Sequence, residues 1–552
     1  MMRPTTASIL SLAALALSAS ATDAPSADLG YVTYTGFTNE TAQINYFYGI
    51  PYAQPPLGNL RWRAPRPIEA SNNFTGQVIN ATLPRPMCYQ SAPPWMVAAP
   101  GPSWGRYGPD YFFQSIPQSE DCLVLNVKAP QNPTGSSLPV FVQLHGGGYV
   151  VGSPELVSPG DAIVHKSNGS LIYVEVQYRL GAFGFLAGSE VKENGDLNVG
   201  LLDQRAALDW VQRHIKAFGG DPSRVTIWGG SAGGSSVTLQ LTAGGAFDQP
   251  PFSAAIPEYP WWIPMLSGST QERQFRTALQ ITNCSDLTCL RGLETSDVQF
   301  INQRVLNMTY PGPQYGFGST YWGPVVDGKF IRQLPDQEYK QGNFHKVPIL
   351  LDHEEYEGYI FSNDSITTLS EETTDAMNVF PSAGPSFFSR LNQLYPQSAY
   401  NSTFFQRQAW FGDVIMKCPT YYVATAFTDM AFNTSAVFKL VFAAGSQLHA
   451  STTPFLTSKS INFPGANNAT LADIMSAYWI SFATTHDPNP LRDSRAPYWP
   501  SYSSGGAGSA AEGQSVGFSV LQVNDKSIEV QADPDNSAAC DFFSSQSRVV
   551  LG

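Results

Sequence analysis

Short apolar runs, each bounded by glycine, proline or polar residues, recur along this chain, and stretches with helical spacing separate them. The runs at 140–144, 225–227, 347–351 and 437–442 have the composition expected of buried strands. Residues 203–218 instead place apolar side chains on one helical stripe. The two patterns alternate from residue 139 to residue 256, which predicts an α/β fold with a mostly parallel sheet flanked by helices.

The run at 225–227 leads directly into Trp228-Gly229-Gly230-Ser231-Ala232-Gly233-Gly234. A serine between glycines after a strand is typical of a nucleophile elbow, a tight turn into a helix whose strained backbone tolerates only small neighbours. The pattern alone is weak in a chain rich in glycine and serine. It makes Ser231 the candidate nucleophile.

A second glycine-rich loop follows the run at 140–144, where the sequence reads His145-Gly146-Gly147-Gly148-Tyr149. Glycines at the end of a strand let main-chain amides approach a substrate oxygen. We expect the amides of Gly147, Gly148 and Ala232 to form an oxyanion hole, in which each donor is typically worth about 3 kcal/mol. The alternative is a flexible turn without such a role.

A serine nucleophile needs a base, and in this kind of fold the chain order is serine, acid, histidine. The histidines far enough along the chain are His345, His353, His449 and His486. His345 and His353 flank the run at 347–351, too early to follow an acid from that strand, and we expect them to be surface or packing residues.

The two later histidines differ in their surroundings. His486 ends the amphipathic segment 471–484, where a cation is favoured at a helix C-terminus, so we expect a structural role. His449 follows the run at 437–442 and the breaker Gly445, which places it on a loop beyond a strand. His449 is therefore the candidate general base.

Several carboxylates follow the run at 347–351, in the segment Asp352-His353-Glu354-Glu355-Tyr356-Glu357-Gly358. Most acidic runs are solvated loop faces, and that interpretation applies to each of these residues taken singly. The glycine after Glu357 favours this residue only weakly.

The residues now support a family resemblance. The chain resembles the type-B carboxylesterases, a group of α/β-hydrolases that includes cholinesterases, mammalian carboxylesterases and several fungal lipases, and it looks most like the secreted fungal carboxylesterases. The matching segments are 48–58 (YGIPYAQPPLG), 120–127 (EDCLVLNV), 198–211 (NVGLLDQRAALDWV) and 218–233 (FGGDPSRVTIWGGSAG).

The resemblance implies an α/β-hydrolase fold in which helical insertions form a cap over an active-site gorge. The family's acid, followed by glycine, corresponds to Glu357, and its histidine corresponds to His449. We expect residues 261–339 and 369–416 to form the cap. The resemblance also implies the disulfides Cys88–Cys122, Cys284–Cys289 and Cys418–Cys540.

The loop closed by the first of these disulfides is rich in aromatic residues and borders the gorge in relatives. About half of these side chains would be expected simply to pack the loop, and the others are candidates to contact an apolar or aromatic substrate. They are Trp95, Trp104, Tyr107, Tyr111 and Phe112.

Three departures from the family pattern limit what the resemblance implies. Gly230 stands where cholinesterases and mammalian relatives usually have glutamate, which argues against a choline ester because no anion would attract the quaternary ammonium. Bulky residues at 256–262 replace a small Ser-Gly pair and are expected to reshape the acyl pocket or its support. Residues 450–452 (AST) replace the glycine and acid that often follow the histidine.

Composition is that of a globular enzyme, because 552 residues with 43% hydrophobic and 14% charged side chains can bury a large core. The matching segments spread along the whole chain, so we expect one domain over residues 22–552. Residues 1–21 are typical of a signal peptide, with Arg3, a short apolar stretch and small residues at 19–21. A glycine- and serine-rich surface loop is expected at 503–515.

Export is also indicated by possible N-glycosylation sites at Asn39, Asn73, Asn80, Asn168, Asn283, Asn307, Asn363, Asn401, Asn433 and Asn468. A net charge of −13 disfavours nucleic acid and anionic membranes as partners, and no apolar run is long enough for a membrane anchor. The chemistry requires no cofactor, and no cysteine or histidine pair has the spacing of a metal site.

The sequence therefore predicts a secreted serine ester hydrolase with the triad Ser231, His449 and Glu357, acting on a neutral, apolar or aromatic small-molecule ester. Three alternatives compete with it. A triacylglycerol lipase would need a long apolar lid, whereas an esterase dedicated to one acylated natural product would have the same sequence features. A non-catalytic binding protein of this fold is disfavoured because serine and histidine are both present.

Overall fold

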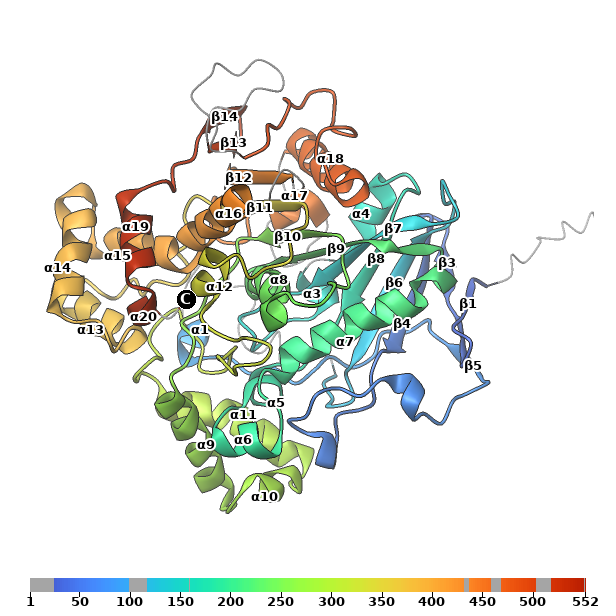
Figure 1. Ribbon diagram of the computed structural model, residues 1–552, viewed down its shortest axis with the longest axis horizontal. Coiled ribbons are helices and arrows are strands. Elements are labelled where there is room, and N and C mark those ends of the chain that lie inside the picture. The colour runs from blue at the N-terminus through green and yellow to red at the C-terminus, as the bar shows by residue number, and fades with distance from the viewer. Residues whose placement is uncertain are drawn as a thin grey trace, which may run out of the picture.

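The computed structural model describes residues 24–98, 117–157, 159–430, 436–457, 468–502, 518–550 and 552. Its centre is an 11-stranded sheet in the order β14-β13-β12-β11-β10-β9-β7-β8-β6-β4-β3, and a smaller sheet joins β1, β2 and β5 (Figure 1). The strands are β1 (Ser26–Asp28), β2 (Thr33–Thr35), β3 (Phe37–Asn39), β4 (Ile44–Pro51), β5 (Val78–Asn80), β6 (Val124–Pro130), β7 (Leu138–Leu144), β8 (Ile172–Val176), β9 (Gly220–Gly230), β10 (Ala254–Glu258), β11 (Ile349–Glu354), β12 (Val437–Ala443), β13 (Ser519–Asn524) and β14 (Ile528–Ala532).

The middle of the large sheet is parallel. All neighbouring pairs from β13 across to β8 run in the same direction, whereas β14 at one edge and β6, β4 and β3 at the other pair antiparallel. Every residue of the parallel strands β7, β8, β10 and β11 is buried, as strands covered on both faces require, and so is every residue of the antiparallel β6. The predicted α/β class with a mostly parallel sheet is confirmed.

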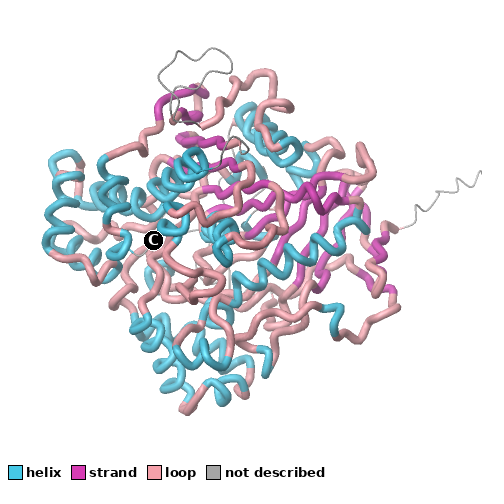
Figure 2. Tube along the Cα trace, viewed as in Figure 1, coloured by secondary structure: helices cyan, strands magenta, loops and turns pink. Residues whose placement is uncertain are grey.

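Helices cover both faces of this sheet (Figure 2). On one face α7 (Val199–His214), α8 (Ala232–Thr242) and α16 (Cys418–Met430) share an apolar cluster with Val142 and Ile227. On the other face α4 (Asp161–Lys166), α17 (Thr453–Thr457) and α18 (Ala469–Thr485) share a cluster with Phe141 and Trp228. The helix expected at 203–218 is α7 followed by a 3-10 turn, Ile215–Phe218.

Two groups of helices outside the sheet form the expected cap (Figure 1). Their buried side chains share one apolar cluster with Ala232 and Tyr259, which lie beside the candidate nucleophile. The groups are α9 (Gly268–Thr282), α10 (Leu287–Arg291) and α11 (Thr295–Thr309), and α13 (Leu369–Val379), α14 (Pro385–Leu394) and α15 (Thr403–Gly412). Shorter helices complete the fold, namely α1 (Pro94–Ala98), α3 (Pro154–Val157), α5 (Gly181–Phe185), α6 (Ser189–Asn194), α12 (Pro335–Lys340), α19 (Ala538–Ser545) and α20 (Ser547–Val550).

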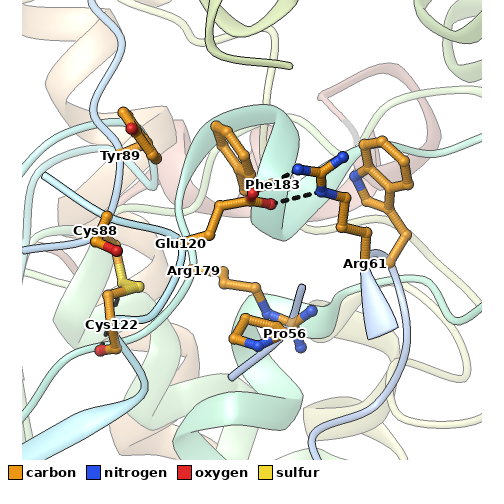
Figure 3. A pocket seen from close by; sticks show the side chains of 10 residues that line it. Pro56, Arg61, Cys88, Tyr89, Glu120, Cys122, Arg179 and Phe183 are labelled. Atoms are coloured by element: carbon orange, nitrogen blue, oxygen red, sulfur yellow. Dashed lines mark hydrogen bonds and ion pairs between the residues drawn. A yellow bond between two sulfur atoms is a disulfide. The ribbon is translucent and has the colours of Figure 1, made fainter. Parts of the chain in front are cut away.

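The three expected disulfides, Cys88–Cys122, Cys284–Cys289 and Cys418–Cys540, are all present. Figure 3 shows the first of them beside a crevice that also contains the buried ion pair between Arg61 and Glu120, whose side-chain atoms approach to 2.6 Å. The crevice encloses only about 10 Å³, so it has no room for an ester.

Some predictions fall outside the described residues. They are the signal peptide at 1–21, the aromatic residues Trp104, Tyr107, Tyr111 and Phe112, the glycosylation site at Asn433 and the loop at 503–515. In the part of the chain that the structure describes, no helix combines the length and the apolar character needed to cross a membrane.

Candidate active site

Ser231 lies at a strained turn between β9 and α8. Its backbone has φ 61° and ψ −125°, values that L-residues adopt rarely. The flanking glycines are required because a Cβ at Gly229 or Gly233 would lie 2.4 or 2.1 Å from the carbonyl oxygen of Leu144. The turn is held from the neighbouring segment, since Ser231 N donates to Glu258 O at 3.2 Å and Trp261 N donates to Ser231 O at 3.1 Å.

The other two predicted side chains lie next to this serine. His449 Nε2 is 2.9 Å from Ser231 Oγ, and His449 Nδ1 is 2.6 Å from Glu357 Oε2. His449 follows β12 and Glu357 follows β11, so the carboxyl ends of three strands of the parallel sheet supply the three residues. Glu357 and Ser231 lie 92 and 218 positions before His449 in the sequence, and the fold brings all three into one hydrogen-bonded line.

The acidic segment differs from its prediction as a solvated loop face. β11 continues to Glu354, so Asp352 and Glu354 belong to the strand, and the side chains of Asp352, Glu354 and Glu357 are completely buried. Strand alternation places Asp352 and Glu354 on the same face. Of the four acids, only Glu355, which is partly buried, fits the prediction of a solvated loop face.

The remaining histidines also have defined positions. His353 and His345 are both buried, and His353 Nε2 pairs with Asp535 at 2.7 Å, so neither is a surface residue. His486 caps the C-terminus of α18 in the left-handed conformation, as its structural interpretation predicts.

The glycine loop after β7 lies directly against the nucleophile turn. A Cβ at Gly146 would approach Ser231 Cβ to 3.2 Å, and Gly147 and Gly148 have φ values of 117° and 63° that favour glycine. Within the described residues, the amides of Gly147 and Gly148 donate no hydrogen bond, and Ala232, the first residue of α8, has no partner inside its helix. These three N–H groups are therefore available to an oxyanion.

Aromatic side chains enclose the imidazole of His449. Tyr259 and Phe361 contact it edge-on, with ring centroids 5.1 and 5.0 Å away, and Trp261 stacks on Phe361 at 5.7 Å. Burial lowers the pKa of His449 to about 4, so the ring is a neutral base at neutral pH. Burial also raises the pKa of Glu357, while its hydrogen bonds to Glu354 oppose this shift.

Two departures from the family pattern prove to be one packing feature. A Cβ at Gly230 would lie 2.2 Å from the hydroxyl oxygen of Tyr259, so the ring of Tyr259 occupies the space of a side chain at position 230. The hydroxyl is hydrogen-bonded to Thr453 Oγ1 at 2.7 Å. Glutamate cannot be accommodated at 230 while Tyr259 stands there.

The described part of the aromatic loop reaches this site indirectly. Trp95 is buried, donates through Nε1 to Ser319 O at 2.6 Å, and lies 6.0 Å from the ring of Phe361. Sequence reasoning did not single out Phe361, Tyr259 or Glu354 as parts of the site. The only signals were the unusual residues at 230 and 259 and the alternation of acids at 352 and 354.

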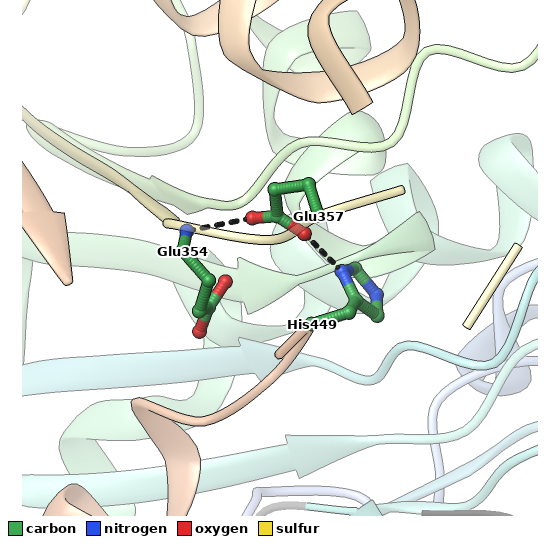
Figure 4. A group of neighbouring side chains, drawn as sticks. All are labelled: Glu354, Glu357 and His449. Atoms are coloured by element: carbon green, nitrogen blue, oxygen red, sulfur yellow. Dashed lines mark hydrogen bonds and ion pairs between the residues drawn. The ribbon is translucent and has the colours of Figure 1, made fainter. Parts of the chain in front are cut away.

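Glu354, Glu357 and His449 also offer atoms within 4.8 Å of one another, a spacing that could hold a metal ion (Figure 4). In this structure Nδ1 of His449 is instead hydrogen-bonded to Glu357, and Nε2 faces Ser231. The arrangement is that of a base oriented by a carboxylate.

The fold and this constellation define a carboxylic ester hydrolase with the α/β-hydrolase fold. Residues 29–515 match the model of the Carboxylesterase family, so the chain belongs to that family.

Named relatives agree with this assignment. The chain is 30% identical to "Carboxylesterase patB" of Aspergillus clavatus, over 98% of this chain and 99% of that protein. It is 31% identical to "Secreted lipase 1" of Botryotinia fuckeliana, over 84% of this chain and 85% of the relative. The crystal structure of Aspergillus niger EstA superposes with a TM-score of 0.81 at 29% identity, covering 96% of this chain and 99% of that one.

Proposed function

We propose that residues 22–552 form a single-domain, secreted serine esterase that hydrolyses a neutral ester through an acyl-enzyme intermediate. The observation that carries this proposal is the hydrogen-bonded line from Ser231 Oγ through the ring of His449 to Glu357. A serine in this setting is activated by an adjacent neutral imidazole, which the carboxylate orients.

Each residue then has one role in the reaction. Ser231 Oγ attacks the ester carbonyl carbon while His449 Nε2 takes the hydroxyl proton, and the amides of Gly147, Gly148 and Ala232 bind the oxygen as it becomes negative. His449 returns the proton to the leaving alkoxide as the carbon–oxygen bond breaks. A water molecule deprotonated by His449 then cleaves the acyl-enzyme and regenerates Ser231.

The surroundings of Ser231 favour an apolar or aromatic substrate. Trp261 and Phe361 form a stacked wall beside the triad, and Gly230 and Tyr259 provide no carboxylate next to the nucleophile. Apolar groups gain by burial against such rings, whereas position 230 offers no anion to a quaternary ammonium. We therefore expect aryl and short aliphatic esters to be hydrolysed faster than choline esters.

Export of the protein rests on separate observations. Residues 1–21 have the composition of a cleavable signal peptide, three disulfides form in an oxidising compartment, and one relative carries the name "Secreted lipase 1". We propose that the mature protein is extracellular and carries N-glycans. The name of that relative also favours one alternative activity, that of a lipase.

Substitution of the nucleophile tests the proposal directly. Ser231→Ala is expected to abolish hydrolysis of p-nitrophenyl esters and labelling by a fluorophosphonate probe, while the thermal unfolding midpoint stays close to that of the unchanged protein. Undiminished turnover in this variant would refute the assignment.

A substrate panel separates esterase from lipase. Rates on p-nitrophenyl esters of increasing acyl length, compared with a triacylglycerol emulsion and a choline ester, are expected to be highest on the soluble neutral esters. Activation at an oil interface would identify a lipase, and rapid choline ester turnover would contradict the argument from Gly230.

A further inference from the structure

Glu354 connects the loop of the acid to the loop of the base. Its backbone N–H donates to Glu357 Oε1 at 2.8 Å, and its own carboxyl oxygen Oε1 accepts a hydrogen bond from Thr452 N at 3.0 Å. Thr452 lies three residues after His449 on the same loop. One completely buried residue at the end of β11 therefore contacts Glu357 through its backbone N–H and the His449 loop through its carboxyl group.

The carboxyl group of Glu354 also lies close to the reacting groups. Its oxygen, an oxygen of Glu357 and a ring nitrogen of His449 fall within 4.8 Å of one another, and Figure 4 shows the three side chains converging. The second oxygen, Oε2, is buried without a hydrogen-bond partner among the described residues. An ionised carboxylate in that position would cost far more than a protonated carboxyl group.

The charges around Glu354 agree with a protonated group. On the same face of the sheet, Asp352 lies two residues earlier on β11 and is paired in register with Glu258 of β10, and both are buried. None of these three carboxyl groups forms an ion pair with a lysine or arginine within the described residues. Burial and the neighbouring carboxylates raise the pKa of Glu354 well above its usual range.

The neighbouring strand offers no cation on this face. The residues of β12 in register with Asp352 and Glu354 are Leu440 and Phe442. Lys439 of β12 and His353 of β11 belong to the alternate positions, where Lys439 pairs with Asp533 and His353 with Asp535. The titratable groups that act on Glu354 are thus Glu258, Tyr259, Asp352, Glu357 and His449.

Taking the proposed triad as its basis, we infer that Glu354 is a positioning residue of this catalytic centre, a protonated carboxyl group that ties the His449 loop to the Glu357 loop. Glu357 is then the single ionised carboxylate of the group. It accepts from the backbone N–H of Glu354 and from His449 Nδ1, so both of its oxygens have donors. Glu354 touches neither substrate nor the transferred proton and acts through the orientation of the imidazole.

Two substitutions separate the hydrogen bond from the charge. Glu354→Gln keeps an oxygen for Thr452 N and cannot ionise, whereas Glu354→Met has similar length and no acceptor. We expect kcat to fall about threefold for Gln and about thirtyfold for Met, with little change in KM, because only Met leaves the buried Thr452 N–H unpaired. Glu355→Gln and Glu355→Met are the matched controls, because Glu355 lies one residue further on and its side chain has no hydrogen bond to any described residue, and they should behave as the unchanged protein.

The pH profile tests whether the carboxyl group of Glu354 is protonated, as the inference requires. The acid limb of kcat/KM should lie at the same pH in Glu354→Gln as in the unchanged protein, because no charge is removed. A shift of this limb to lower pH would mean that an ionised Glu354 had been stabilising the imidazolium, and would overturn the inference. Equal losses in the Gln and Met variants would overturn it as well.

A double-mutant cycle tests whether Glu354 acts through the triad. In a Glu357→Gln background, Glu354→Met should cost much less than it does alone, since the orientation of His449 is already impaired. Full additivity would contradict the inference. If Ser231→Ala retained activity, the proposed function itself would fail, whichever result the Glu354 variants gave.

Discussion

Gly230→Ala is expected to impair the enzyme although it adds a single methyl group away from the triad side chains. The new Cβ would lie 2.2, 2.3 and 2.5 Å from Oη, Cζ and Cε2 of Tyr259. Ordinary contacts of a Cβ begin at 3.4 Å, so the ring of Tyr259 must withdraw by about 1 Å or the turn at Ser231 must shift.

The structure sets the size of the effect. Overpacking of a core of this kind costs about 1–3 kcal/mol, and loss of the Tyr259–Thr453 hydrogen bond adds about 1 kcal/mol. The displaced ring of Tyr259 lies edge-on to His449, with the ring centroids 5.1 Å apart, so its displacement also disturbs the orientation of the His449 imidazole. If 1.4–2.8 kcal/mol is lost in the transition state, kcat/KM falls about 10- to 100-fold.

The assay is hydrolysis of a p-nitrophenyl ester, with active sites titrated by a fluorophosphonate so that unfolded protein is not counted. Gly268→Ala is the matched control, because a Cβ there meets no atom within 4 Å, and it should retain full activity. In a Tyr259→Ala background the cost of Gly230→Ala should largely disappear. An equal cost in both backgrounds would refute the proposed clash.

Three further predictions concern pH and stability. Because burial lowers the pKa of His449 to about 4, kcat/KM should stay high well below pH 6.5 and decline only as the imidazole becomes protonated; an acid limb centred near 6.5 or above would contradict this. Burial and the neighbouring Glu354 raise the pKa of Asp352, so its contribution to stability is complete below its unfolded-state pKa and is lost as the pH rises through the folded-state value. The melting temperature of Asp352→Asn relative to that of the unchanged protein should therefore increase between pH 4 and pH 8. A difference that does not depend on pH would disprove the argument. The Cys88–Cys122 disulfide closes a loop with a sequence separation of 34 residues, and its removal should lower the free energy of unfolding by about 3.8 kcal/mol in denaturant titrations. An unchanged transition would show that other contacts constrain the loop.

Sequence reasoning selects those candidate site residues that the backbone itself makes conspicuous. Ser231 occupies a turn that requires glycines on both sides, and His449 was isolated by chain order and by its position after a strand. The acid was different, because four carboxylates follow one strand and only the family resemblance selected Glu357. Local sequence does not show which acids of such a run are buried.

The features that sequence reasoning missed depend on distant contacts. Gly230 and Tyr259 form one packing unit across 29 positions, and Asp535, 182 residues away, is the partner of His353, for which a packing role was one of the two expected. β11 extended further than its apolar run because Asp352 and Glu354 continue the pairing with β12. Hydrophobic pattern alone ends a strand where the charges begin, whereas burial of protonated acids allows it to continue.

The wide spacing of the triad along the chain has a consequence for biosynthesis. Ser231 emerges from the ribosome 218 residues before His449, and translation at about 5–20 residues per second takes roughly 10–45 s to cover that distance. Until then, the strand–turn–helix that carries the serine lacks its proton acceptor. On the proposed mechanism, a polypeptide terminated before His449 is therefore catalytically silent, and hydrolytic activity appears only after the loop that follows β12 has been made.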